Sequence, residues 1–419
     1  MEITIHRGTS EIGGSCVQLR SGNRSILLDA GAPLGDTQSP VDLTRLEFTD
    51  AFISHPHQDH YGMIEGLDSS RTIHIGGIAR ELIAATRTFL GTAPLNNRFC
   101  PLVNRRPVEV GPFRVTPYLM DHSAVDAFGF LIEAEGKRVY YSGDFRAHGR
   151  RNQIFEQFVA KPPADIDLLL MEGTMLGRSK QKLDDEAAVT SEMATVLEQT
   201  SGPCFLICSG QHIDRLSDTF AACMTANPRR ILVTDAYTAY ILYRVSKTFP
   251  GVPSIVTKQD VRVLTEGLTW DFHKKAFEAH PEQFREFLDL LNSGGKTITV
   301  KDVLLNGSRY FLKVSNFSDL FRSLQKANVS AIYSQWEGYR LEEHNPDGFQ
   351  KLADTEQFVG SDNFHSIHTS GHATLKDLQR FAKALKPKQL IPIHTEYKQR
   401  YLELFDSVKL LDDGETLYL

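Results

Sequence analysis

A short, histidine-rich turn is the strongest chemical signal in the sequence. It follows an apolar strand directly and offers four candidate metal ligands within six residues: His55, His57, Asp59 and His60. His55 and His57 alternate in a backbone that is still extended, so both side chains point the same way and can reach one metal. Asp59 and His60 lie past the bend and can face a second metal close by. Mixed imidazole and carboxylate ligands suit Zn²⁺ best, with Mn²⁺ or Fe as alternatives.

The competing interpretation of this turn is a solvated polar loop that binds no metal. Three histidines and one aspartate at this spacing rarely arise by chance, so we favour the metal cluster. Such a cluster needs further ligands, and His122 and Asp144 each stand where a predicted strand ends. A carboxylate at a strand end can bridge two metals about 3.5–4 Å apart. We therefore expect these two residues to complete a dinuclear site.

Short strands separated by glycine-rich turns must position this cluster. The pattern predicts strands near 2–6, 16–19, 25–29, 51–54, 107–118, 128–133 and 138–143, with a helical stretch over about 62–90. The apolar strand 165–171 should be buried on both faces. Strands and helices then alternate from 204 onward, which predicts a second α/β unit built on a parallel sheet. A helix over 374–385 and a strand over 389–393 end the pattern.

Composition limits the class of protein. The chain has 419 residues, 41% hydrophobic and 23% charged, which favours a soluble protein of two or three domains. A net charge of −6 excludes a broad basic coat for nucleic acid, although one cleft could still be basic. The five cysteines form no CxxC pair, which favours reduced thiols. With no signal-peptide pattern and no apolar run of membrane-spanning length, we expect a cytoplasmic protein without membrane association.

The order of the motifs resembles the metallo-β-lactamase superfamily, whose HxHxDH signature stands here at residues 55–60. Asp29 matches the family's first aspartate, which is expected to support the ligands rather than bind metal itself. Three later residues look like motifs A, B and C of the β-CASP nucleases: Glu172, His372 and His394. About 200 residues separate motifs A and B, the size expected for an inserted β-CASP domain.

Segments 209–216 and 234–240 are especially similar to ribonuclease J-like proteins. The resemblance implies an α/β fold, a metallo-β-lactamase αββα sandwich with an inserted α/β β-CASP domain. It divides the chain into a first lactamase part (1–176), the β-CASP domain (177–362) and a C-terminal lactamase part (363–419). Because the sequence ends at Leu419, just after the last predicted strand, we expect it to lack the C-terminal domain of typical ribonuclease J.

The resemblance also implies roles for the site residues. One metal would take His55, His57, His122 and Asp144, and the other would take Asp59, His60, Asp144 and His394. Solvent held between two divalent cations loses a proton near pH 7 and could attack phosphorus in line. Catalysis is expected to involve Asp59, Glu172 and His372, with His372 protonating the leaving ribose oxygen and Glu172 orienting it. The alternatives are a turn carboxylate for Glu172 and a helix-start residue without chemistry for His372.

Two strand-to-helix turns are candidate phosphate sites. Ser209 and Ser370 each precede a glycine before a predicted helix, where free backbone N–H groups attract anions. Such turns use serine and glycine anyway, so a purely structural role is equally open. By analogy with ribonuclease J, His368 and Ser370 could hold a substrate phosphate. Three arginines after the bridging aspartate could track an RNA backbone, although such a run is more often a solvated loop: Arg146, Arg150 and Arg151.

The leading functional hypothesis is a metal-dependent ribonuclease acting on single-stranded RNA, internally or from the 5′ end. A histidine at motif C is typical of RNA-directed β-CASP proteins rather than DNA-directed ones. A hydrolase of a small ester, lactone or thioester could use the same metals, but the inserted domain argues against it. A binding or scaffold protein that has lost catalysis would have no physical reason to keep every ligand. A homodimer is a further expectation from the resemblance.

Overall fold

The computed structural model describes residues 1–34, 40–178, 183–315, 318–324 and 328–419. By their internal contacts, the residues form two compact units. Unit 1 comprises Met1–Arg80, Leu95–Lys180 and Gly371–Leu419, and unit 2 comprises Glu81–Pro94 and Gln181–Ser370.

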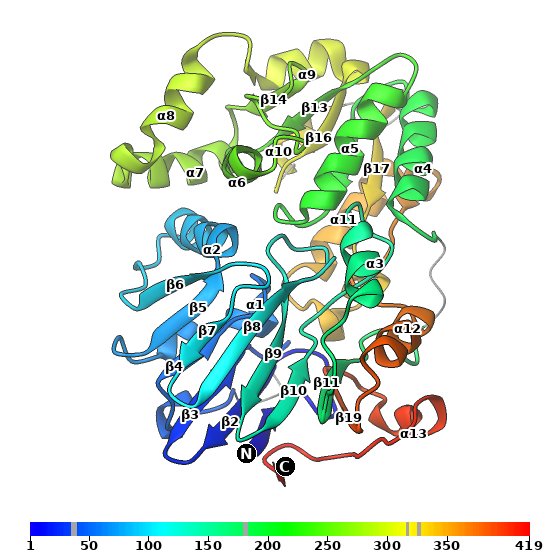
Figure 1. The fold of residues 1–419 in the computed structure, drawn as a ribbon. Coiled ribbons are helices and arrows are strands. Elements are labelled where there is room, and N and C mark those ends of the chain that lie inside the picture. The colour runs from blue at the N-terminus through cyan, green and yellow to red at the C-terminus, as the bar shows by residue number, and fades with distance from the viewer. Residues whose placement is uncertain (35–39, 179–182, 316–317, 325–327) are drawn as a thin grey trace. The chain divides into compact units, whose positions relative to one another are not determined.

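Unit 1 contains two sheets that pack face to face (Figure 1). The first has the strand order β20-β1-β2-β3-β4-β5-β6, and its strands are β1 (Glu2–Arg7), β2 (Cys16–Ser21), β3 (Arg24–Leu28), β4 (Asp50–Phe52), β5 (Thr72–Gly76), β6 (Arg98–Leu102) and β20 (Thr416–Tyr418). The second has the order β19-β11-β10-β9-β8-β7, and its strands are β7 (Val108–Val110), β8 (Phe113–Leu119), β9 (Phe128–Ala134), β10 (Lys137–Tyr141), β11 (Leu168–Glu172) and β19 (Gln389–Ile393).

Apolar side chains on alternating strand positions form the core between these sheets. Ile3 and Leu19 of the first sheet share one buried cluster with Phe130 and Leu170 of the second. The other face of the second sheet is covered by α3 (Gln153–Ala160) and α12 (Leu375–Leu385), whose Phe381 ring packs 5.0 Å from that of Phe158. The expected layering of helix on sheet on sheet is therefore present on this side. Unit 1 also holds α1 (Gln58–Tyr61) and α13 (Tyr401–Leu404).

Parallel pairing gathers several strand ends at one edge of the second sheet. β10, β11 and β19 run parallel, and Glu172 pairs with Ile393 in register. Asp144, Glu172 and His394 therefore lie at or just after the carboxyl ends of neighbouring strands. In the first sheet, β3 and β4 are also parallel, which places Asp29 and His55 together just beyond two adjacent strand ends.

Unit 2 is built on one parallel sheet with the order β15-β14-β13-β16-β12-β17-β18. Its strands are β12 (Cys204–Ile207), β13 (Ile231–Thr234), β14 (Val261–Leu264), β15 (Thr297–Ile298), β16 (Tyr310–Lys313), β17 (Ser330–Tyr333) and β18 (Phe364–Ser366). Its helices are α4 (Glu186–Gln199), α5 (Ile213–Thr225), α6 (Ala236–Thr248), α7 (Leu268–Ala279), α8 (Pro281–Asn292), α9 (Val300–Asn306), α10 (Ser318–Ser323) and α11 (Phe349–Val359). The predicted second α/β unit with a parallel sheet is confirmed.

The continuous helical stretch predicted over 62–90 is wrong. The helix α2 covers only Gly77–Leu90, and β5 (Thr72–Gly76) precedes it as an inner strand of the first sheet. Ile73 and Ile75 are buried between paired strands, and such a short apolar run fits a buried strand as well as a helix. Sheet pairing on both sides, which is a tertiary effect, decides between the two.

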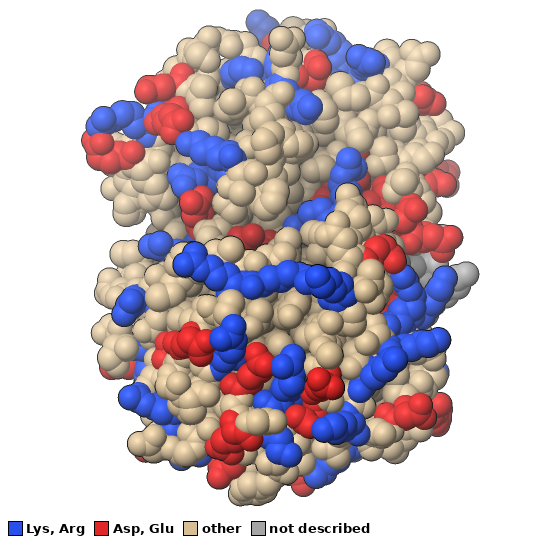
Figure 2. Space-filling model, viewed as in Figure 1, with Lys and Arg blue, Asp and Glu red and all other residues tan. Residues whose placement is uncertain are grey.

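The surface charges and the state of the cysteines agree with the predictions from composition. On the face shown in Figure 2, basic and acidic side chains are interspersed. All five cysteines are free, and burial raises the pKa of Cys208 to about 11. Among the described residues, every helix is too short or too polar to cross a membrane.

Candidate metal centre and catalytic site

The histidine-rich turn is positioned by the end of β4 and the start of α1. His57 precedes α1 in an extended conformation (φ −94°, ψ 144°), and its carbonyl accepts the N–H of His60 at 2.9 Å. His55 therefore lies on extended chain, whereas Asp59 and His60 lie on the first helical turn. This change of backbone sends the two halves of the motif toward different neighbours, as the spacing predicts.

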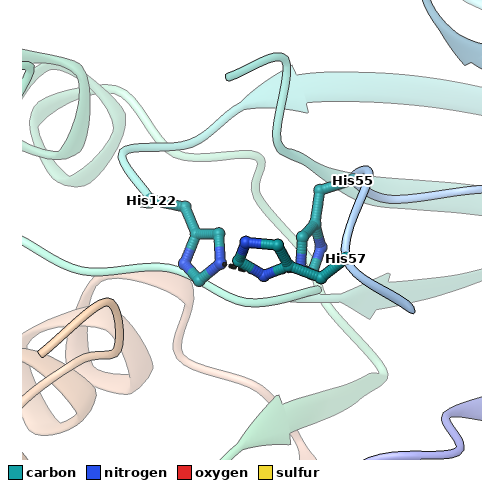
Figure 3. Close-up of side chains that lie close together, drawn as sticks. All are labelled: His55, His57 and His122. Atoms are coloured by element: carbon teal, nitrogen blue, oxygen red, sulfur yellow. Dashed lines mark hydrogen bonds between the residues drawn. The ribbon is translucent and has the colours of Figure 1, made fainter. Parts of the chain in front are cut away.

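Three imidazoles converge on one point in unit 1 (Figure 3). Nε2 of His55 lies 3.1 Å from Nδ1 of His57, and Nε2 of His122 lies 3.2 Å from the same atom. These nitrogens form a group that could hold one metal ion. His122 follows β8, so tertiary pairing brings it to the turn.

A second group consists of Asp59, His60 and His394. Nε2 of His394 lies 3.6 Å from Oδ2 of Asp59. His394 follows β19 in the left-handed backbone region (φ 49°), which is costly for a residue other than glycine and is typical of functional positions. Its backbone N–H donates to the carbonyl of Gly8 at 2.6 Å, which fixes this conformation.

Asp144 lies between the two groups. Its Oδ2 is 3.2 Å from Nε2 of His60, 3.7 Å from Nε2 of His55 and 3.8 Å from Nε2 of His394. One carboxylate is thus within reach of ions held by either group. This is the arrangement that a bridging ligand requires.

The donor atoms fit divalent cations. Nε2 of His60, Nε2 of His394 and both carboxylate oxygens of Asp144 are buried and have no hydrogen-bond partner among the described residues. Leaving buried polar atoms unsatisfied is expensive, and a cation coordinated by them would remove that cost. Burial, together with the neighbouring imidazoles, also lowers the pKa of His55 well below its usual value. The neutral imidazole that results is the form that binds metal.

Glu172 and His372 lie beside Asp144. Glu172 is fully buried at the end of β11, and its Oε2 accepts the N–H of Thr174 at 3.0 Å while Oε1 accepts that of Ala373 at 3.3 Å. Nδ1 of His372 lies 3.5 Å from Oε1 of Glu172 and 3.6 Å from Oδ2 of Asp144. Burial alone would lower the pKa of His372, but these carboxylates outweigh it and raise the pKa. The pair can hold a proton on His372 next to the metal ligands.

Asp29 is hydrogen-bonded to residues of this centre. It is fully buried, and its carboxylate accepts hydrogen bonds from Ser54 N–H (2.7 Å), Ser54 Oγ (2.8 Å) and Tyr141 Oη (2.6 Å). It also lies 2.7 Å from Nδ1 of His60. Asp29 therefore contacts a candidate ligand through the ring nitrogen opposite Nε2.

The candidate phosphate residues lie in unit 2. Ser209 is exposed just after β12, and its Oγ accepts the N–H of Gln211 at 3.2 Å. His368 and the buried Ser370 lie just after β18. Nη1 of Arg215, on α5, lies 3.2 Å from Nδ1 of His368. The role of these residues toward phosphate stays a prediction.

Two of the three arginines that we considered for RNA are structural instead. Arg146 is fully buried with its Nε 4.0 Å from Oδ1 of Asp121, so it cannot line an RNA path. Nη2 of Arg151 donates to the carbonyls of His122 (3.0 Å) and Ala124 (2.9 Å). Arg151 thus holds the loop that carries His122. Arg150 is exposed.

Residues 10–171 match the model of the metallo-beta-lactamase superfamily, and residues 362–405 match that of the Zn-dependent metallo-hydrolase RNA specificity domain. The chain carries a metallo-β-lactamase domain. Its fold is that of this superfamily with an α/β insertion. The chain also matches a solved structure, titled as a protein of unknown function from Enterococcus faecalis V583, with a TM-score of 0.77 and 20% identity, covering 100% of this chain and 99% of that one. At this identity the match concerns the fold alone.

Several curated relatives of this chain are named as ribonucleases. It is 22% identical to "Ribonuclease J" of Mycoplasma genitalium over 388 residues, which cover 88% of this chain and 63% of that protein. It is 22% identical to "Probable RNase MJ4" of Methanocaldococcus jannaschii, over 95% of this chain and 94% of that protein. The chain thus resembles ribonuclease J-like nucleases but spans less than two thirds of the length of the Mycoplasma relative.

Sequence analysis missed Ser15 and Tyr141, which contact the metallo-β-lactamase centre. Ser15 Oγ lies 2.9 Å from Nδ1 of His394, and Tyr141 donates to Asp29. Ser15 is 379 residues from His394 in the chain, so no local spacing could link them. The only available signal was the position of Tyr141, three residues before Asp144 on the same strand edge.

Proposed function

We propose that this protein is a metal-dependent ribonuclease that hydrolyses phosphodiester bonds in single-stranded RNA. The observation that carries the proposal is the position of Asp144 between two imidazole groups and beside the Glu172–His372 pair. Ions held by the two imidazole groups could generate a nucleophile, and the Glu172–His372 pair can hold a proton. The names of the relatives and the RNA specificity match support RNA as the substrate class.

The proposed cofactor is a pair of divalent cations, with Zn²⁺ as the expected ion and Mn²⁺ as the alternative. One ion would be held by His55, His57, His122 and Asp144, and the other by Asp59, His60, Asp144 and His394. Bound cations of this kind supply hydroxide at neutral pH and neutralise charge on the phosphoryl oxygens. The protein would keep the Nε2 atoms of His60 and His394 directed toward the shared carboxylate of Asp144.

His372 would donate the proton that the leaving ribose oxygen needs. Hydrolysis forms a bond from solvent oxygen to phosphorus and breaks the bond from phosphorus to the ribose oxygen, which must then be protonated. Nδ1 of His372 faces Glu172 and Asp144, so Nε2 is the atom that could reach the leaving oxygen. Glu172, whose carboxylate accepts hydrogen bonds from three backbone N–H groups, would orient the imidazole.

The proposal includes a β-CASP domain over residues 177–362 that takes part in binding RNA, and three candidate phosphate contacts: Ser209 within that range, and His368 and Ser370 just after it. A small ester or lactone would not need such a domain. A homodimer and a cytoplasmic location remain predictions, and sedimentation of the metal-loaded protein tests the former.

The deciding experiment incubates metal-loaded protein with 5′-monophosphorylated single-stranded RNA, DNA of the same sequence and a chromogenic ester. We expect cleavage of the RNA, loss of that cleavage in Asp144→Asn, and retention in Asp68→Asn, a matched change at an exposed aspartate. Ester turnover with intact RNA would replace the proposal by a small-molecule hydrolase. Preferential cleavage of the DNA would replace it by a DNA-directed nuclease. With a 5′ label, release of mononucleotides indicates a 5′ exonuclease, and release of longer fragments indicates internal cleavage.

A further inference from the structure

The two segments that resemble ribonuclease J-like proteins, 209–216 and 234–240, meet within unit 2. Gly210 lies in the turn between β12 and α5, and a Cβ at this position would lie 2.9 Å from Oγ1 of Thr238 and 3.2 Å from Cε1 of Tyr237. The turn therefore packs directly against the first residues of α6. A side chain at position 210 would force one of these neighbours to shift, so the glycine keeps the turn in place.

The side chain of Gln211, the next residue, is held by a closed network of hydrogen bonds. Its Nε2 donates to Oγ1 of Thr86 on α2 and to Oη of Tyr237 on α6, both at 2.7 Å. These two oxygens lie 2.9 Å apart, and Thr86 also lies 2.8 Å from the carbonyl oxygen of Leu82, to which it donates. All four residues belong to unit 2.

The supply of protons determines which end of the amide faces this network. The four contacts need four protons, of which the amide nitrogen supplies two, Thr86 one and Tyr237 one. Burial raises the pKa of Tyr237, so its hydroxyl keeps its proton. If the amide were turned over, its oxygen would bring no proton, and two of the four contacts would join oxygens with no proton between them. Nε2 of Gln211 therefore faces the network, and Oε1 faces away from it.

The outward oxygen of Gln211 is available to a ligand. The side chain is half-buried, and its Oε1 has no hydrogen-bond partner among the described residues. Ser209 is exposed two residues earlier, and its Oγ accepts the N–H of Gln211 at 3.2 Å, which leaves its own proton to be donated outward. The end of β12 thus offers a fixed acceptor and a hydroxyl donor. Parallel α/β sheets bind their ligands outside the carboxyl ends of their strands, which is where these groups lie.

Each nucleotide of RNA carries the complementary groups. Its phosphate oxygens only accept hydrogen bonds, whereas its ribose 2′-hydroxyl can donate one, and DNA lacks that hydroxyl. Because the amide of Gln211 cannot turn over, it presents an acceptor and never a donor. We propose that Gln211 is a specificity-determining residue, whose Oε1 accepts a hydrogen bond from a ribose 2′-hydroxyl and so favours RNA over DNA. The inference rests on the RNA substrate of the proposed function.

The test measures binding of 5′-monophosphorylated single-stranded RNA by fluorescence anisotropy. Zn²⁺-loaded protein with the change His372→Ala serves as the parent, so that the RNA stays intact, and electrophoresis of the recovered RNA verifies this. In a set of oligonucleotides, one ribose at a time is replaced by deoxyribose. We expect one of these replacements to weaken binding by the parent about 2–10-fold, the usual effect of losing one hydrogen bond.

Gln211→Met removes the acceptor and keeps the length of the side chain. In this variant the critical deoxyribose replacement should have no effect, and intact RNA should bind as weakly as the replaced RNA binds to the parent. Gln283→Met is the matched control, because Gln283 is exposed on α8 with a single contact of 3.5 Å to Thr88, and it should show the full effect. Tyr237→Phe keeps Oε1 but removes one anchor of the amide, so it should reduce the effect in part. This variant also tests the same amide if Gln211→Met does not fold.

Three results would overturn the inference. The parent could show no dependence on any 2′-hydroxyl, or Gln211→Met could keep the full dependence while binding all the oligonucleotides more weakly, as a purely structural role requires. Thirdly, Gln211→Met could remove a dependence on the base at one position instead of the sugar, which would assign the oxygen to a base.

These results differ from a failure of the proposed function. Binding that depends on one 2′-hydroxyl through Gln211, with RNA left uncleaved by the wild type, would refute the ribonuclease and not this recognition. Cleavage of RNA by the wild type, with no 2′-hydroxyl contributing to binding, would refute the recognition alone.

Discussion

Replacing Arg215 by methionine should destabilise unit 2 strongly. Arg215 is fully buried on α5, and its guanidinium binds the buried Glu186 through two contacts of 3.3 and 3.4 Å. It also donates to the carbonyls of Ser334 and Thr369, both at 3.3 Å. Methionine matches the length of arginine but provides no charge and no donor. The change therefore removes the cation that faces Glu186 and the donors that serve two carbonyls.

The magnitude follows from this burial. Removing one partner of a buried ion pair typically costs about 3–5 kcal/mol, because the other charge stays in the interior. For a unit of this size the dependence of stability on urea is about 3 kcal/mol per molar. The midpoint of unfolding should thus fall by about 1–1.7 M urea.

Tryptophan fluorescence is a suitable probe of this unit, since both tryptophans of the chain, Trp270 and Trp336, lie in unit 2. Urea titration followed by tryptophan fluorescence therefore reports on this unit. Arg285→Met is the control, because Arg285 pairs with Glu282 on the surface with a side chain that is 66% exposed, and such pairs contribute little. The double variant Glu186→Gln, Arg215→Met should recover part of the loss by removing one of the two buried carboxylates near the guanidinium, the other being Asp218 at 3.9 Å from Nε. A shift below about 0.3 M for Arg215→Met, or one equal to that of the control, would refute the reasoning.

Three further changes test other parts of the structure. His372→Ala should abolish RNA cleavage while elemental analysis finds the same metal content, and joint loss of metal and activity would contradict a role as proton donor. A Cβ on Gly31 would lie 1.8 Å from the carbonyl oxygen of Asp59, so Gly31→Ala should displace that ligand and weaken metal binding about tenfold or more. Gly66→Ala is the control, because a Cβ there would have open space around it, and it should leave the metal affinity unchanged. Equal metal affinities in the two variants would argue against the contact between Gly31 and Asp59. Burial lowers the pKa of His273, so the folded state favours the neutral ring and unit 2 should lose stability as the pH falls below 6.5, where the unfolded chain takes up a proton. In His273→Phe this part of the pH dependence should disappear from urea titrations, and an unchanged dependence would show that the ring does not contribute.

Local spacing was enough to find the features whose parts lie close together in the chain. The turn from His55 to His60 carries its ligands within six residues, so the bend after the extended chain could be anticipated from the sequence, whereas the short helix α1 that follows it was not predicted. The alternation of strand and helix in unit 2 could be read in the same way, because each element has its own hydrophobic period. His372 and His394 were found through a resemblance, as no periodicity connects them to the turn.

Predictions from the local sequence pattern were wrong where contacts distant in the chain determine the structure. The segment Thr72–Gly76 is compatible with helix or strand, and it becomes a strand because β4 and β6 pair with it on both sides. Arg146 follows Asp144 closely and looks like a surface cation, yet the fold buries it completely. In both cases contacts distant in sequence outweigh the local preference.

The sequence by itself determined the chemistry available to this protein, because residue types and short spacings specify which donor atoms exist and which of them lie on one turn. Tertiary structure decided how those atoms meet. The parallel register of β10, β11 and β19 places Asp144, Glu172 and His394 at one sheet edge, and the first strands bring Ser15 to His394 across 379 residues. Hydrogen bonds and metal coordination act over a few ångströms in space, and only the folded chain fixes those distances.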